Sequence, residues 1–137
     1  HTTLGTIGPE QADYLISHGV KPEKIIIGHM DLSQDTDYIL SVLEKGVNVG
    51  FDTVGKLNYC PDTFRMEALK RIAAEGRLHQ VVLSMDITRK SHLKYKGGIG
   101  YGYMFESFIP LLKENGFTGK QIDQLLVENP ARILQDA

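Results

Sequence analysis

The 137-residue sequence has no long apolar run, no excess of either charge and only one cysteine. No run approaches the ~18 apolar residues needed to cross a bilayer, so we expect no membrane-spanning segment. The 15 basic and 17 acidic side chains give a net charge of -2, and nucleic-acid binding would need a basic face. Cys60 cannot form an internal disulfide by itself. We therefore expect a cytoplasmic protein with no nucleic-acid or membrane partner.

The sequence also lacks a methionine at position 1 and begins directly with His-Thr-Thr. We expect no signal sequence and no capped element ahead of these residues. We therefore expect the 137 residues to start partway through a larger structure.

Short apolar runs alternate with segments of helical period along the whole chain. Strands are predicted over 24–29, 47–53 and 80–86, and the apolar runs IIIG and VVLS are typical of parallel strands that are covered on both faces. Helices are predicted between and after them, over 9–19, 33–46, 63–76, 104–116, 119–129 and 130–135. This alternation favours βαβ units in a single α/β domain with a parallel sheet over 1–137.

Each predicted strand ends in an ionisable side chain. The strands end at His29, Asp52 and Asp86, and His1 would be a fourth example if His-Thr-Thr closes a further strand. In parallel α/β proteins the carboxyl ends of the strands form the working edge. Two imidazoles and a carboxylate suit zinc or a similar divalent ion, so this recurrence predicts a metal site.

Each of these residues also has a structural interpretation. A single histidine after a strand is more often hydrogen-bonded than a metal ligand, and a single aspartate often caps the next helix. We expect Asp31 and Asp35 to act as such caps. Cys60 lies beside a proline in a turn-rich segment with no evident base, so it is a poor candidate for a nucleophile.

Several consecutive motifs together carry a family resemblance. They are HTTLGTIGPEQ, IIIGHMD, VGFDTVGK, VVLSMDITRKSHLKYKGGIGYGYMFESFIPLL and LLVENPARIL. Over essentially the whole chain the sequence resembles the phosphotriesterase family of the amidohydrolase superfamily, in the branch of the phosphotriesterase homology proteins.

The resemblance implies a (β/α)8 TIM-type barrel, of which residues 1–137 would form strands five to eight and their helices. It implies that His1, His29 and Asp86 are metal ligands in a binuclear centre, with zinc as the expected metal and manganese as the alternative. It also implies hydrolysis by a metal-activated water, with Asp86 as ligand and general base.

The sequence departs from the family pattern in two respects. It has no His-x-His pair, and it has no counterpart of the bridging ligand, which is a carbamylated lysine or a glutamate in the family. Thr53 and Leu32 stand where the organophosphate-hydrolysing branch has a proton relay. These two residues argue against efficient triester hydrolysis and leave the substrate open.

Three further residues are predicted to bind the substrate. Arg89 follows Asp86 closely and could meet an anionic group such as a carboxylate or a phosphate. Asp52 could shape the pocket, orient a ligand from behind, or be a buried structural residue. Tyr101 is expected to pack on the pocket rim, together with Tyr103.

The leading prediction is a metal-dependent hydrolase of an ester, lactone or phosphoester. The chain could instead be an inactive half-barrel, or an assembly module that pairs with an N-terminal half or with a second copy. Open sheet edges would favour such pairing. A third alternative is a binder of small molecules that has no catalytic activity.

Overall fold

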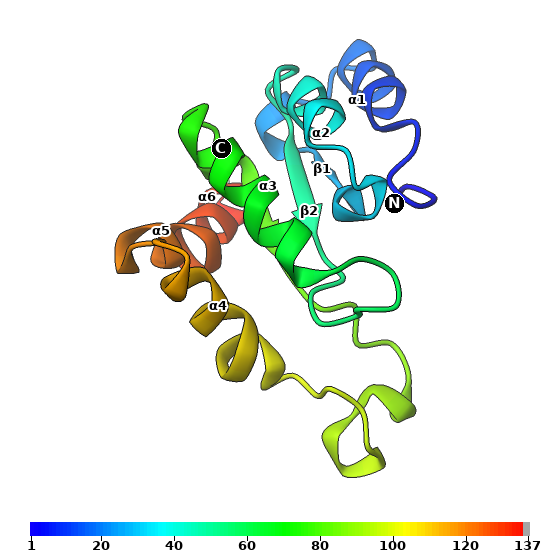
Figure 1. The fold of residues 1–137 in the computed structure, drawn as a ribbon. Helices are drawn as coiled ribbons and strands as arrows, with labels where there is room; N and C mark the ends of the chain where they lie inside the picture. Colours follow the sequence, from blue (N-terminus) through cyan, green and yellow to red (C-terminus); the bar gives the residue numbers. More distant parts are fainter. Residues whose placement is uncertain (136–137) are drawn as a thin grey trace.

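A computed structural model describes residues 1–135 and shows an α/β architecture built on a small parallel sheet (Figure 1). The strands are β1 (Ile26–Ile27), β2 (Asn48–Phe51) and β3 (Val81–Leu83), in the order β1-β2-β3. Both strand pairs are parallel. The predicted fold class is confirmed at this level, although each strand is shorter than predicted.

Helices follow each strand and complete the chain. They are α1 (Gly8–Ser17), α2 (Thr36–Leu43), α3 (Asp62–Ala74), α4 (Ile109–Glu114), α5 (Gly119–Asp123) and α6 (Asn129–Leu134). π-Helical turns over Met104–Phe108 and Gln124–Glu128 lead into α4 and α6. Figure 1 shows that the segment between β3 and α4 forms a long excursion away from the sheet.

The core lies between the sheet and these helices, with β2 at its centre. All four residues of β2 are buried. Ile26 of β1 is 43% exposed, although the apolar run predicted burial on both faces. Ile25 and Ile27 are buried, so the difference lies between the two faces of the sheet: residues 1–135 leave the face from which the Ile26 side chain projects partly uncovered.

Residues 1–2 lie beside β1 without forming a strand. The hydroxyl of Thr2 donates to the carbonyl oxygen of Gly28 at 2.7 Å. This contact brings His1 to the carboxyl end of β1. The structure therefore has three strands within residues 1–135, where the sequence suggested the end of a fourth.

Neutral carboxamides occupy the amino edge of the sheet. The side-chain nitrogen of Asn48 donates to the carbonyl oxygens of Glu23 and Ile25, both at 2.9 Å. Gln80 and Asn129 each make the same kind of pair, with carbonyl oxygens that precede β2 and flank the start of β3. These bonds fix the strand starts. No helix within residues 1–135 is long and apolar enough to cross a membrane.

Candidate active site

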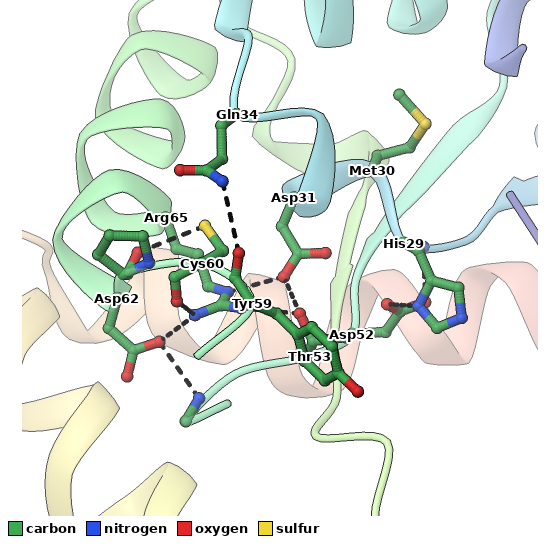
Figure 2. A network of polar contacts seen from close by, with 12 residues as sticks. His29, Met30, Asp31, Gln34, Asp52, Thr53, Tyr59, Cys60, Asp62 and Arg65 are labelled. Carbon is green, nitrogen blue, oxygen red and sulfur yellow. Dashed lines mark hydrogen bonds and ion pairs between the residues drawn. The ribbon is translucent and has the colours of Figure 1, made fainter. Parts of the chain in front are cut away.

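The carboxyl edge of the sheet gathers the ionisable residues that follow the strands. The Asp52 carboxylate makes two contacts with His29 (Figure 2). One Asp52 oxygen accepts from the His29 backbone N–H at 2.9 Å, and the other lies 2.6 Å from His29 Nδ1. Asp52 is therefore placed to orient His29, which is one of the roles that its sequence position allowed.

Two strand glycines make room for the Asp52 carboxylate. A Cβ atom at Gly50 would lie 2.9 Å from Asp52 Oδ2, and one at Gly28 would lie 3.1 Å from the same oxygen. The glycines in IIIGH and VNVGFD are therefore a sequence signal for a side chain buried between the strands. Burial raises the pKa of Asp52, against the lowering effect of its hydrogen bonds and charge interaction with His29.

His1 and His29 lie side by side at this edge. Their ring centroids are 4.5 Å apart and the rings are nearly perpendicular, at 85°. Since Asp52 occupies Nδ1 of His29, Nε2 is the ring nitrogen available to another partner. Both His29 and Asp86 adopt left-handed backbone conformations, with φ of 62° and 46°. Such strain in residues other than glycine is concentrated at functional sites.

Asp86 makes an ion pair with Lys56. Lys56 is only 8% exposed, so its ammonium group is directed into the structure rather than into solvent. The motif VGFDTVGK contains this lysine, but its position in a turn gave no sign that it would meet Asp86. The structure thus adds Lys56 to the predicted site residues.

A cavity of about 240 Å³ contains the three predicted metal ligands in its wall. Its lining is His1, Thr2, Thr3, Leu4, His29, Leu32, Thr53, Tyr59 and Asp86. A larger groove of about 430 Å³ runs between His1 and α1, but it lacks Asp86 and His29. The smaller cavity is therefore the one that matches the predicted chemistry.

The ligand set fits a divalent metal by chemical type but is not closed in this conformation. Within residues 1–135, no three histidine, cysteine, aspartate or glutamate side chains come close enough together to form a ready-made metal site. The two imidazoles are adjacent, whereas the Asp86 carboxylate is directed to Lys56. That ion pair engages only Oδ2 of Asp86, so the second carboxylate oxygen is the one that could serve a metal.

A second cavity, of about 270 Å³, adjoins the first through one shared lining residue. Lys56, Arg89 and His92 contribute its ionisable groups, and Tyr59 borders both cavities. Arg89 therefore lies where an anionic group could be held. Tyr101 is 67% exposed and lines neither cavity, so the structure does not bring it to the predicted rim.

Asp31 does not cap a helix, contrary to the prediction. It is fully buried and accepts from Arg65 Nε at 2.7 Å (Figure 2). The α2 cap is Asp35 alone, which accepts from the Tyr38 N–H as predicted. Sequence reasoning missed Arg65 because a basic residue on an amphipathic helix normally faces solvent. Cys60 is fully buried, and burial raises the pKa of its thiol to about 11, which agrees with its dismissal as a nucleophile.

Comparison with known proteins places this geometry in a family context. The Phosphotriesterase family profile matches residues 1–134. The phosphotriesterase homology protein of Escherichia coli (strain K12) is 44% identical over 135 residues, which cover 98% of this chain and 46% of that protein. A phospho-furanose lactonase of Mycoplasmopsis synoviae (strain 53) is 36% identical over 141 residues, covering 98% and 40% respectively.

Solved structures agree with the sequence matches. The crystal structure of the Escherichia coli phosphotriesterase homology protein, complexed with phosphate in its active site, superimposes with a TM-score of 0.95 at 44% identity. The match covers 98% of this chain and 47% of that one. The chain thus spans about half the length of the curated relatives it matches.

Proposed function

Because the chain belongs to the phosphotriesterase family, we propose that it forms the catalytic part of a metal-dependent hydrolase. The bond cleaved is an ester, a lactone or a phosphoester of a small molecule. The observation that carries the proposal is the single cavity lined by His1, His29 and Asp86. A lone buried cysteine supports a cytoplasmic site of action.

His1, His29 and Asp86 would hold the metal, with zinc the first candidate and manganese the alternative. A binuclear centre is the arrangement that the family resemblance implies. A divalent ion bound there would supply an activated water and polarise the bond to be cleaved. Asp52 acts on His29 by fixing its ring through Nδ1, so that Nε2 is presented to the cavity.

Asp86 is the proposed general base. Its carboxylate lies in the cavity wall and can accept a proton from the attacking water. The neighbouring Lys56 ammonium compensates the negative charge of Asp86 before reaction.

The second cavity supplies the substrate preference. Lys56 and Arg89 place two cations in its wall, beside the cavity that contains Asp86. Two cations in one wall suit a phosphate or carboxylate group. The similarity to a phospho-furanose lactonase, and to a structure with phosphate in its active site, supports a phosphorylated lactone or ester as substrate.

Turnover measurements test this proposal. The full chain, supplied with zinc or manganese, is assayed with phosphorylated lactones and with their unphosphorylated counterparts. We expect hydrolysis that a chelator abolishes and added metal restores, with preference for the phosphorylated substrates. Arg89→Gln should raise KM for the phosphorylated substrates and leave KM for the neutral ones unchanged. Hydrolysis that a chelator does not affect would overturn the metal-dependent mechanism.

The Asp86→Asn variant distinguishes an enzyme from a binding protein that has no catalytic activity. Binding of inorganic phosphate together with no turnover in the wild-type chain would favour a binding protein. If the wild-type chain hydrolyses substrate, the variant should keep phosphate binding and lose hydrolysis.

A second proposal concerns assembly. Within residues 1–135, β1 and β3 each pair on one side only, and Ile26 of β1 is half exposed. Such edges favour pairing with further strands, either from an N-terminal half of the barrel or from a second copy. Sedimentation of the chain tests this proposal, because a strictly monomeric, cooperatively folding species would exclude it.

A further inference from the structure

A fully buried arginine joins the segments that form the walls of both cavities. Arg65 is on α3 and has no exposed surface. Its Nε donates to Asp31 Oδ2 at 2.7 Å, and its Nη2 donates to Thr53 Oγ1 at 2.7 Å. Its Nη1 donates to Asp62 Oδ1 at 2.6 Å and to the carbonyl oxygen of Cys60 at 2.7 Å. Every nitrogen of the guanidinium group is thus bonded (Figure 2).

These partners come from three different segments. Asp31 lies in the turn after β1, two residues beyond His29. Thr53 and Cys60 begin and end the loop after β2, and Asp62 opens α3. Arg65 therefore holds the turn after β1 against the loop after β2.

The turn after β1 lines the first cavity alone, whereas the loop after β2 lines both cavities, with Thr53 and Tyr59 in the wall of the first. His29 and Leu32, from the turn after β1, line the cavity of the proposed metal ligands. Lys56 and Asn58, from the loop after β2, line the cavity of the proposed anion site. The distance between the two cavities therefore depends on how these segments are held together. This distance sets how far the bond that is cleaved can lie from the anionic group of the substrate.

Thr53 adds a direct contact between the two segments. Its hydroxyl donates to Asp31 Oδ2 at 2.6 Å and accepts from Arg65. The single hydroxyl hydrogen of Thr53 is therefore committed to a buried carboxylate. Although Thr53 lines the first cavity, it has no proton to offer a substrate there.

The same network reaches the long segment before α4. The hydroxyl of Tyr103 donates to Asp62 Oδ2 at 2.9 Å, and the N–H of Gly55 donates to Asp62 Oδ1 at 3.2 Å. Gly55 has a left-handed φ of 82°, and a Cβ there would lie 2.7 Å from the Tyr103 ring. Tyr103 thus packs directly on the loop that carries Lys56.

We propose that Arg65 is a positioning residue that fixes the spacing between the hydrolytic cavity and the anion-binding cavity, with Tyr103 extending the same control to the segment before α4. The inference rests on the proposed function for its consequence in catalysis. A guanidinium group is required because a lysine ammonium cannot reproduce the planar fork that meets four acceptors.

Hydrogen exchange of the full chain tests the positioning without any substrate. In Arg65→Lys, we expect amide exchange over 29–33 and 53–62 to accelerate about 10- to 100-fold relative to β2 and β3, because the loss of charged hydrogen bonds makes local opening easier. Ile72→Val is the matched control, because Ile72 is equally buried on the same helix and makes no polar contact. Tyr103→Phe is the milder variant, and it should accelerate exchange over 98–103 and leave 29–33 unchanged.

Binding of zinc and of inorganic phosphate adds the functional readout. Arg65→Lys should weaken phosphate binding about 10-fold and leave zinc binding within about twofold, because Asp52 still orients His29. If Arg65→Lys and Ile72→Val give the same exchange pattern, the positioning role is overturned. If the wild-type chain binds neither probe, the proposed function fails, and the exchange pattern still decides the role of Arg65.

Discussion

The amino edge and the carboxyl edge of the sheet are both polar, but their polar groups differ in charge and in what they contact. At the amino edge, Asn48, Gln80 and Asn129 each donate two hydrogen bonds to backbone carbonyl oxygens. At the carboxyl edge, Asp52 and Asp86 are paired with His29 and Lys56. Neutral amides therefore fix the strand starts, whereas charged groups surround a cavity at the strand ends.

The difference shows which edge is built for stability. A buried amide that meets its acceptors carries no charge into the interior. The carboxyl edge instead includes two residues in left-handed conformations, His29 and Asp86, which cost about 1–3 kcal/mol each. Strain and buried charge are tolerated where chemistry needs them. Changes at the two edges should consequently separate activity from stability.

The largest effect is expected from Asp86→Asn. The variant keeps the size of the side chain and a hydrogen-bond acceptor for Lys56, but it loses the proposed base. Turnover should fall about 100- to 10,000-fold, whereas the urea unfolding midpoint should fall only modestly, because Lys56 keeps a hydrogen-bond acceptor but loses its charged partner. A steady-state assay beside an unfolding curve measures both. Unchanged turnover in a folded variant would exclude Asp86 as the base.

At the opposite edge, Asn129→Ala should affect stability alone. It removes the donor that serves the carbonyl oxygens of Leu78 and Val81, so the free energy of unfolding should fall by about 2 kcal/mol. Urea unfolding measures the loss. Val127→Ala, at a 62% exposed neighbouring position, is the control and should change little. A loss of turnover without a loss of stability would contradict the division between the edges.

Asp52→Asn tests the orientation of His29. The substitution weakens the hydrogen bond that fixes the His29 ring, and we expect zinc affinity to fall about 10- to 100-fold. Isothermal titration with zinc measures the change. Asp35→Asn is a matched control, because this exposed cap lies outside the cavity and asparagine also caps helices well. Equal zinc affinity in Asp52→Asn and the wild type would remove Asp52 from the site.

The smallest effect concerns alkaline pH. Burial raises the pKa of the Cys60 thiol from 9.0 to about 11, so the unfolded chain loses this proton first as pH rises. The stability that this group contributes is fully present below pH 9 and is lost as pH rises through about 11. Unfolding curves between these values should show a decline that Cys60→Ala reduces. An identical decline in both proteins would assign it to other groups.

The sequence predicted the alternation of strands and helices well, because apolar runs and helical periods are local signals. It also predicted that the residues after the strands would meet, since parallel strands end at one edge. His29 and Asp86 do line one cavity with His1. Gly28 and Gly50 could be read from the sequence, but their role could not. The structure shows that a side chain at either position would crowd the Asp52 carboxylate.

Other contacts depend on packing that no local pattern encodes. Arg65 lies on an amphipathic helix, and its burial depends on Asp31 from the distant turn after β1, in addition to Asp62 one turn earlier on the same helix. Lys56 reaches Asp86 across 30 positions of sequence. Tyr101 and Tyr103 were equivalent in the sequence, yet only Tyr103 finds a buried acceptor in Asp62.

We propose that the carboxyl edge is a hydrolytic metal site, whereas the amino edge is structural. The decisive measurement is a crystal structure of the full chain grown with zinc and inorganic phosphate, in which zinc is located by anomalous scattering. We expect zinc on His1, His29 and Asp86, and phosphate between Lys56 and Arg89. Zinc bound only elsewhere would contradict the assignment of this edge.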